Sequence, residues 1–410
     1  MKRSVLQYGN RELSHSFSFV LILCYKNVVP RTGRCCLKLS SNPQSTRLIN
    51  VACQLVEHLP DVDVRAAFLF GSAAWGDADA ASDLDIMLLL DRPAGYREVT
   101  RIRLADLFGY PLPDGPVFAD LDRIAVETFV SSLQTGNWAQ RVVNSVILAD
   151  TDDFYVRLRS QVSTAFWQPS TRREMFLAKQ KQSDESRTAA LKVSGIDDML
   201  SALHARLALQ HAGAALIELS GNRVSPSHFV EGLEKALNRF DSGLFARCLA
   251  ALSLNAPYAA VERSLRAYDV FADAIKRWVH DPGIESRLSQ EDLAWARHTY
   301  GKQEEITHKV AELTRTKRLP TLLYYLDGLF QGPICIQAGK IFHLRSSGKA
   351  ERMAVPDFQV ALQQEPALYD EWIAALRLSS ERDQVLEVIN LTRQLLSVGK
   401  AALEKDKLHG

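Results

Sequence analysis

The chain has 410 residues, of which 47% are apolar and 24% charged, and its formal net charge is +1. These values are typical of a soluble globular protein with two or three domains. A near-neutral charge argues against bulk binding of nucleic acid, which needs a clustered basic surface, and favours neither acidic partners nor a membrane.

The cysteines give no sign of a structural cross-link. No two of them form a CxxC pair, and their spacing suits neither a zinc site nor a disulfide framework. We therefore expect reduced thiols and a cytoplasmic protein. The six cysteines are Cys24, Cys35, Cys36, Cys53, Cys248 and Cys335.

Residues 1–43 are expected to be a poorly ordered leader. The first 44 residues hold seven Lys or Arg and one Glu, and they show no usable periodicity. The apolar run Phe17–Tyr25 is shorter than the roughly 20 residues that span a membrane, and no small-residue cleavage site follows it. An over-extended start would explain the leader, and a signal peptide is the alternative.

Residues 44–168 are predicted to form a small mixed α/β domain. Apolar residues recur at helical spacing before Pro60, and two short runs are strongly apolar, as in strands that are covered on both faces. The predicted strands are Val64–Phe70, Leu84–Leu90, Arg123–Val130 and Ser145–Ala149. The predicted helices cover 44–59, Glu98–Phe108, Ser131–Asn144 and Asp152–Trp167.

Residues 169–410 are predicted to be mostly α-helical, so the fold class is α+β. Pro169-Ser170-Thr171 breaks the earlier pattern, and long helical periodicities follow. The stretch Gln331–Gly348, with its glycines and a proline, is expected to be a loop or short hairpin that divides two subdomains near 320–350. The predicted helices are Leu200–Ile217, Pro226–Phe240, Tyr258–Val279, Glu291–Leu313, Asp357–Leu376 and Glu381–Glu404.

A Gly-Ser turn follows the first strand, in the run Phe68–Gly76. A strand that enters a short helix through such a turn exposes backbone N–H groups at the start of the helix, which is a suitable place for an anion. Gly71 lets the backbone approach phosphates closely, and the Ser72 hydroxyl can donate a further hydrogen bond. Gly71 and Ser72 are therefore the candidate nucleotide-binding residues.

Asp83 and Asp85 stand two apart at the head of the second strand, with ten residues between Ser72 and Asp83. The two-residue period of a strand points both carboxylates to one face. Two adjacent carboxylates repel each other, and a bound divalent cation relieves that repulsion. Magnesium prefers carboxylate and phosphate oxygens, so the pair and the Gly-Ser turn together predict a metal–nucleotide site.

The combined pattern resembles the signature of the DNA polymerase β-like nucleotidyltransferases. The resemblance rests on a hydrophobic strand, the Gly71-Ser72 turn, and then Asp83-x-Asp85 at the start of an apolar strand. It implies transfer of a nucleoside monophosphate from an NTP, with ATP the expected nucleotide, two Mg²⁺ ions, and release of pyrophosphate.

The family has a third acidic residue on a later strand, and Glu127 in the run Arg123–Val130 is the expected match. The resemblance thus makes Asp83, Asp85 and Glu127 the catalytic and metal-binding residues. The alternative for Glu127 is an exposed carboxylate on an edge strand. Asp120 and Asp122 are the rival candidates, although both are expected to lie in a turn before that strand.

Several nearby residues are expected to have ordinary roles. Trp75 stands where many relatives carry a basic residue, which puts one phosphate or substrate contact in doubt. Asp77 and Asp79 are expected to be solvated loop acids. Arg223 follows a helix stop and is interpreted as a surface arginine, although it could reach a nucleotide.

The order of the domains, the run Leu203–Leu219 and the turn Ser220–Pro226 are similar to antibiotic nucleotidyltransferases of the kanamycin or streptomycin type. This looser resemblance implies a small hydroxylated acceptor such as an aminoglycoside. An enzyme that modifies a protein or RNA, as in toxin–antitoxin pairs, is an alternative, and the near-neutral charge argues against RNA. A non-catalytic nucleotide sensor is a third, against which the Asp-x-Asp motif argues.

Overall fold

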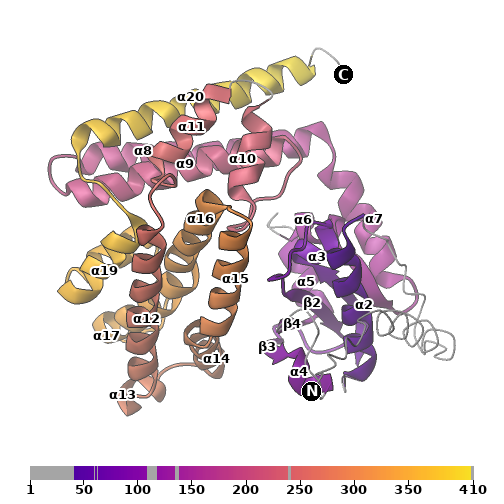
Figure 1. The fold of residues 1–410 in the computed structure, drawn as a ribbon. Helices are drawn as coiled ribbons and strands as arrows, with labels where there is room; N and C mark the ends of the chain where they lie inside the picture. The colour runs from indigo at the N-terminus through magenta and orange to yellow at the C-terminus, as the bar shows by residue number, and fades with distance from the viewer. Residues whose placement is uncertain are drawn as a thin grey trace, which may run out of the picture.

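The computed structural model describes residues 41–59, 61, 63–108, 118–133, 138–238 and 242–407. Residues 1–40 of the expected leader lie outside these ranges. A sheet with flanking helices forms one part of the chain, and a larger helical part lies beside and above it (Figure 1). The structure therefore confirms an α+β chain with a mixed sheet near the N-terminus.

Among the described residues, the sheet has five strands in the order β3-β4-β2-β1-β5. Neighbouring strands are antiparallel except β2 and β4, which are parallel. The sheet is therefore mixed, as predicted. The strands are β1 Val64–Phe70, β2 Leu84–Leu90, β3 Arg97–Arg103, β4 Phe118–Ala125 and β5 Val146–Asp150.

Helices cover both faces of the sheet. Along β1, Ala67 and Leu69 pack in the cluster that contains residues of α2 (Pro43–His58), whereas Ala66 and Phe68 pack in the cluster on the opposite face. This alternation follows the two-residue period of a strand. The opposite cluster draws on α5 Val126–Leu133, α6 Ala139–Val143 and α7 Phe154–Phe166.

The predicted strands Val64–Phe70 and Leu84–Leu90 are confirmed, but two other predictions in this part are wrong. Residues 97–103 form strand β3, and only Leu104–Phe108 form a helix, α4. The strand predicted at Arg123–Val130 is β4, which begins at Phe118 and ends at Ala125. A helix, α5, takes up the remaining residues.

The C-terminal part is built from helices around one large hydrophobic cluster, which draws on residues from Phe176 to Leu396. Helices α8, α9 and α20 lie side by side across its top (Figure 1). The helices are α8 Pro169–Val193, α9 Asp198–Leu219, α10 Phe229–Leu237, α11 Ser242–Ala251, α12 Ala259–Val279, α13 Pro282–Glu285, α14 Gln290–Tyr300, α15 Gln303–Arg315, α16 Leu319–Leu329, α17 Cys335–Ser347, α18 Val355–Leu362, α19 Pro366–Leu376 and α20 Arg382–Lys407.

The loop predicted at Gln331–Gly348 is helical instead. A π-helical turn, Phe330–Ile334, joins α16 to α17 and contains Pro333. Proline lacks the N–H that a regular α-helix would use here, and single π turns inside α-helices interrupt that regular hydrogen-bond pattern. Gly339 provides close packing within this helix, because a β-carbon there would lie 3.2 Å from the Cβ of Met353. The proposed division into two subdomains near 320–350 remains a prediction.

Two of the predicted long helices are each broken into a pair, α14 with α15 and α18 with α19. The first break falls at Gly301, where a β-carbon would lie 2.9 Å from the carbonyl oxygen of Arg297. The second precedes Pro366, which occupies the first turn of α19 as proline often does. Among the described helices, none combines the length and apolar character needed to cross a membrane.

Candidate active site

The register of three strands places the central residues of the site in one row. Asp85 on β2 pairs with Asp120 on the parallel strand β4. Asp120 in turn pairs with Arg101 on the antiparallel strand β3. Side chains directly opposite one another in a sheet share a face and lie within contact distance. Two carboxylates and a guanidinium therefore meet at this point of the sheet.

Asp83, Asp85 and Asp120 form an acidic trio. Each offers a carboxylate oxygen, and these atoms all lie within 4.8 Å of one another. Burial and then the charges of Asp83 and Asp120 raise the pKa of Asp85 to about 8. Burial and then Asp83 raise the pKa of Asp120 to about 6. Oxygen ligands so close together, whose mutual repulsion a cation would relieve, fit Mg²⁺ or a similar ion.

Glu127 does not take the third position that the sequence suggested. It is exposed and lies in the first turn of α5, beyond the end of β4. Asp120 takes that position, because β4 begins five residues earlier than predicted and makes Asp120 a strand residue rather than a turn residue. The buried neighbours Ala119 and Leu121 alternate with Asp120, and this pattern could have indicated the strand.

Gly71 lies against the trio. It begins the short helix α3, Gly71–Trp75, with a backbone φ of +72°. A β-carbon at this position would lie 1.9 Å from Oδ2 of Asp85. Only glycine accommodates both the left-handed backbone and this contact. Gly71 thus lies beside the trio and Ser72 lines the same cleft, and their binding of a nucleotide stays a prediction.

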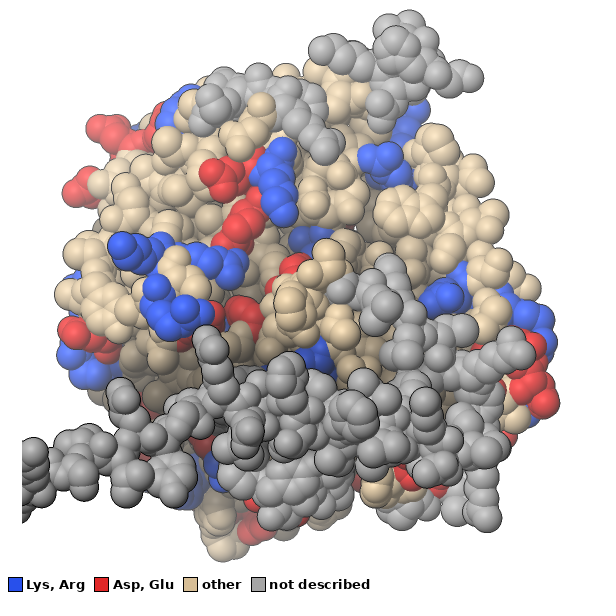
Figure 2. Space-filling model, turned by 45° about the vertical axis from the view of Figure 1, so that its right-hand side comes forward, with Lys and Arg blue, Asp and Glu red and all other residues tan. Residues whose placement is uncertain are grey.

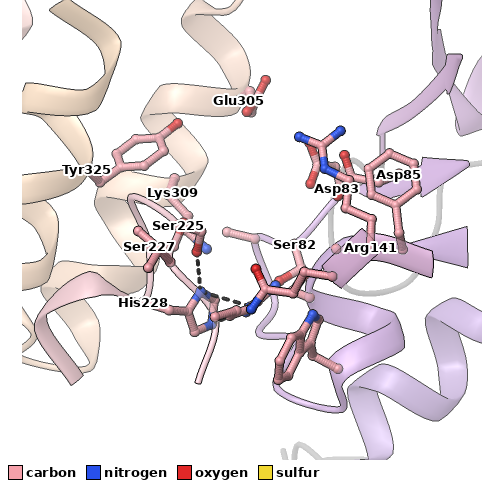
Figure 3. Close-up of a pocket in the computed structure, with 18 of the residues that line it drawn as sticks. Ser82, Asp83, Asp85, Arg141, Ser225, Ser227, His228, Glu305, Lys309 and Tyr325 are labelled. Atoms are coloured by element: carbon pink, nitrogen blue, oxygen red, sulfur yellow. Dashed lines mark hydrogen bonds between the residues drawn. The ribbon is translucent and has the colours of Figure 1, made fainter. Parts of the chain in front are cut away.

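A cleft of about 460 Å³ opens between the two parts of the chain. Asp83, Asp85 and Arg141 approach it from the sheet side, and Glu305 and Tyr325 face them from the helical side (Figure 3). Its charged lining is balanced, with four acidic and four basic residues. These are Asp83, Asp85, Glu218 and Glu305, and Arg141, Lys179, Arg223 and Lys309.

Arg223 is a residue of the cleft rather than the surface arginine expected from the sequence. Its side chain is 10% exposed, and its Nη2 donates to Oδ1 of Asp77 at 2.7 Å. Its guanidinium lies 5.7 Å from the centre of the Trp75 ring. His228 also lies against Asp77, with Nε2 at 3.2 Å from Oδ2, and burial and then Arg223 lower the pKa of His228 to about 3.

Asp79 is not a solvated loop acid, whereas Asp77 is exposed as expected, although it pairs with Arg223 and His228. The ammonium group of Lys309, on α15, donates to both carboxylate oxygens of Asp79 at 2.9 and 3.1 Å. The ring of His308 lies 3.0 Å from the carbonyl oxygen of Ala80. The loop between the Gly-Ser turn and Asp83 is therefore held by the helical part. Partners more than 140 residues away in the sequence could not be inferred from local pattern.

Arg101 was also missed, because residues 98–108 were predicted to be helical. Its Nη1 donates to the two carboxylate oxygens of Asp120 at 2.8 and 2.9 Å and lies 3.9 Å from Oδ2 of Asp83. Its Nη2 donates to Oε2 of Glu305, on α15, at 2.5 Å. Arg101 thus links the acidic trio to the helical part.

Arg141, on α6, supplies a cation on the other side of Asp85. Its guanidinium lies 5.1 Å from the ring centre of Phe70 and 4.5 Å from that of Trp138. Burial lowers the pKa of Arg141, and the charge of Asp85 opposes that change. Stacking against two rings holds the guanidinium at the edge of the cleft.

Comparison with known proteins gives a family match for the part of the chain that holds the acidic trio. Residues 47–129 match the family model described as a nucleotidyltransferase domain. A solved structure, that of a nucleotidyltransferase-like protein from Exiguobacterium sibiricum, is similar at 12% identity and a TM-score of 0.29, over 80% of this chain and 90% of that one. No curated protein matches the chain. The chain contains a polymerase β-like nucleotidyltransferase domain, and its acidic trio is consistent with catalysis.

Proposed function

We propose that the chain transfers a nucleoside monophosphate from an NTP, with ATP the favoured donor, to a hydroxyl group of a small molecule such as an aminoglycoside. The observation that carries this proposal is the acidic trio beside the Gly71-Ser72 turn, of which Asp83 and Asp85 line a cleft with basic residues in its walls. The matched nucleotidyltransferase domain supplies the class of reaction.

The trio would hold the metal. Asp83, Asp85 and Asp120 together offer the oxygen ligands that Mg²⁺ prefers, and two ions are proposed. When bound, the ions would supply activation of the attacking hydroxyl and neutralisation of charge on the phosphates.

The phosphates would lie over the Gly71-Ser72 turn. Because α3 has only five residues, its dipole is small, and side chains must provide much of the positive charge. Arg223 lines the cleft above the Trp75 ring and is placed to supply the cationic contact that Trp75 cannot. Arg141 lies on the opposite side of Asp85 and would stabilise charge on the transferred phosphate.

The proton of the acceptor hydroxyl would move to a carboxylate oxygen of Asp120. Asp120 belongs to the trio that would hold the metal, and a carboxylate close to the activated hydroxyl is a suitable general base. Attack of the deprotonated oxygen on the α-phosphorus forms the new P–O bond, and the bond to the pyrophosphate oxygen breaks. Positioning and charge stabilisation then provide most of the rate acceleration.

A small acceptor fits the cleft better than a nucleic acid does. Its volume of about 460 Å³ is within the range of small-molecule sites. Around the hollow, the described residues in Figure 2 show basic and acidic side chains mixed together, an arrangement that does not favour a phosphate backbone. Glu218 in the wall would favour an acceptor that carries an amino group.

The test is incubation of the protein with each of the four NTPs, Mg²⁺ and a panel of hydroxylated acceptors, including aminoglycosides. Pyrophosphate release and the mass of the acceptor are measured together. We expect release with one NTP and an acceptor heavier by one nucleoside monophosphate. A protein that gains the mass of a nucleoside monophosphate, while the small molecule does not, would identify a protein-modifying enzyme. If no combination of NTP and acceptor released pyrophosphate, nucleotidyl transfer would be contradicted.

A further inference from the structure

We infer that Arg101 and Glu305 together set the affinity of the acidic trio for divalent metal. Arg101 competes with the ion for the carboxylates of Asp120 and Asp83, and Glu305 provides the guanidinium with a second partner away from the ion. The inference rests on the proposed metal site. It adds a means by which the helical part controls the loading of that site.

The competition follows from the contacts of the Nη1 atom of Arg101. This atom lies 2.8 Å from Oδ1 and 2.9 Å from Oδ2 of Asp120, and 3.9 Å from Oδ2 of Asp83. These two carboxylates belong to the trio that fits a metal. The Arg101 side chain is only 16% exposed, so water screens its charge poorly. A divalent ion that enters the trio is therefore repelled by the positive charge of Arg101, which lies next to two of the three carboxylates.

The second partner lies at the other end of the same guanidinium. Nη2 donates to Oε2 of Glu305 at 2.5 Å, and that oxygen also lies 3.5 Å from Nζ of Lys302. The planar guanidinium can bind carboxylates on two sides at once. The ring of Phe118, whose centre lies 4.7 Å from the Arg101 guanidinium, limits where the group can move. In the part of the chain that the structure describes, Glu305 is the carboxylate outside the trio that forms an ion pair with Arg101.

Helix α15 fixes the position of Glu305 relative to the sheet. One turn farther along, Lys309 on the same helix forms its ion pair with Asp79, and its side chain is 8% exposed. Residues four apart lie on the same face of a helix. A single face of α15 therefore contacts both the loop before Asp83 and the guanidinium beside Asp120. The contact between the two parts of the chain and the affinity for metal should be coupled.

The inference predicts effects of opposite sign for the two residues. Arg101→Gln removes the competing cation, so the trio should bind a divalent ion more tightly, by about tenfold, as expected for loss of a poorly screened charge a few ångströms away. Glu305→Gln leaves Arg101 with the trio alone and should weaken binding several-fold. In the double variant the effect of Glu305→Gln should vanish, because Glu305 acts through Arg101.

The experiment measures Mn²⁺ binding to the full chain without nucleotide, from the electron paramagnetic resonance signal of free Mn²⁺. Arg103→Gln is the matched control. Arg103 is also on β3 and pairs with α15, through Glu304 at 3.0 Å, but this pair is about half exposed and does not include the trio. Arg103→Gln should leave the affinity for Mn²⁺ within about twofold of the wild-type value. Circular dichroism and the melting temperature establish that each variant folds.

The outcomes separate this inference from the proposed function. If the wild type fails to bind Mn²⁺ and releases no pyrophosphate, the proposed metal site itself is wrong. If the wild type binds Mn²⁺ but Arg101→Gln leaves the affinity unchanged or weaker, the competition is wrong. If Glu305→Gln weakens binding equally in the Arg101→Gln background, Glu305 acts on the ion directly and the proposed route through Arg101 is overturned.

Discussion

The α-carbon of Gly71 faces the carboxylate of Asp85 so closely that a β-carbon would lie 1.9 Å from Oδ2. Gly71, in the turn proposed to hold the phosphates, is therefore in direct contact with Asp85, which is proposed to bind the metal. Gly71 also has a φ of +72°, which few residues other than glycine adopt readily. Any side chain at position 71 must displace Asp85 or reshape the turn.

Gly71→Ala should therefore abolish most of the activity and destabilise the fold. Gly95→Ala is the control, because Gly95 has a φ of +89° but no heavy atom within 4 Å of an added β-carbon. Both variants carry the backbone strain of about 1–2 kcal/mol, and only Gly71→Ala adds the clash. Urea unfolding and pyrophosphate release measure the two effects. Equal losses for the two variants would show that the contact with Asp85 does not matter.

Asp85→Asn should stabilise the fold in the absence of divalent metal, and the gain should grow with pH. The pKa of Asp85 is raised from 3.8 in an unfolded chain to about 8 in the folded protein. Between these values the folded state binds more protons than the unfolded state, so the free energy of unfolding of the wild type falls as the pH rises. Asparagine does not titrate and escapes this loss.

The measurement is urea unfolding in the presence of EDTA at pH 5 and pH 8. Glu127→Gln removes an exposed carboxylate from the same domain and should change the stability by less than about 0.5 kcal/mol. A gain for Asp85→Asn that is the same at both pH values would argue against the raised pKa. A loss at pH 8 would contradict it outright.

Lys309→Gln should weaken the contact between the two parts of the chain. The Lys309 side chain is 8% exposed and that of Asp79 is 21% exposed, so the pair is mostly but not fully buried. Its loss should cost about 2 kcal/mol, between the values for exposed and for fully buried pairs. Because Asp79 lies in the loop before Asp83, the KM for NTP should also rise.

The comparison for Lys309→Gln is Arg247→Gln, which breaks an ion pair with Glu387 whose side chains are 44% and 52% exposed. That change should cost less than about 1 kcal/mol and leave the KM for NTP unaltered. Thermal unfolding and steady-state kinetics test both variants. If Lys309→Gln behaves like Arg247→Gln, the loop does not depend on α15.

The sequence predicted the part of the site that is local and missed the part that depends on distant pairing. Strands β1 and β2, with the Gly-Ser turn and the Asp-x-Asp pair, lie within 27 residues and carry their own pattern. Asp120 was set aside because the start of β4 was misplaced. Arg101 was missed because β3 was read as a helix, and its importance arises only from the register with Asp120.

The partners of the loop acids show the same limit. Nothing near Asp79 in the sequence indicates that Lys309 binds it, because helix α15 is brought there by the packing of the whole helical part. Gly339, in the stretch predicted to be a loop, misled for a related reason. Glycine permits both turns and close helix packing, and the neighbouring Met353 decides which is used here.

The most direct test of the central claim compares Asp120→Asn with Glu127→Gln in the pyrophosphate assay, with the NTP and acceptor that serve the wild type. Asp120 belongs to the trio, whereas Glu127 is exposed on α5. We predict that Asp120→Asn lowers turnover by about 10²–10⁴-fold and that Glu127→Gln leaves it near the wild-type value. Full turnover by Asp120→Asn, or a collapse with Glu127→Gln, would contradict the assignment of Asp83, Asp85 and Asp120 as the catalytic centre.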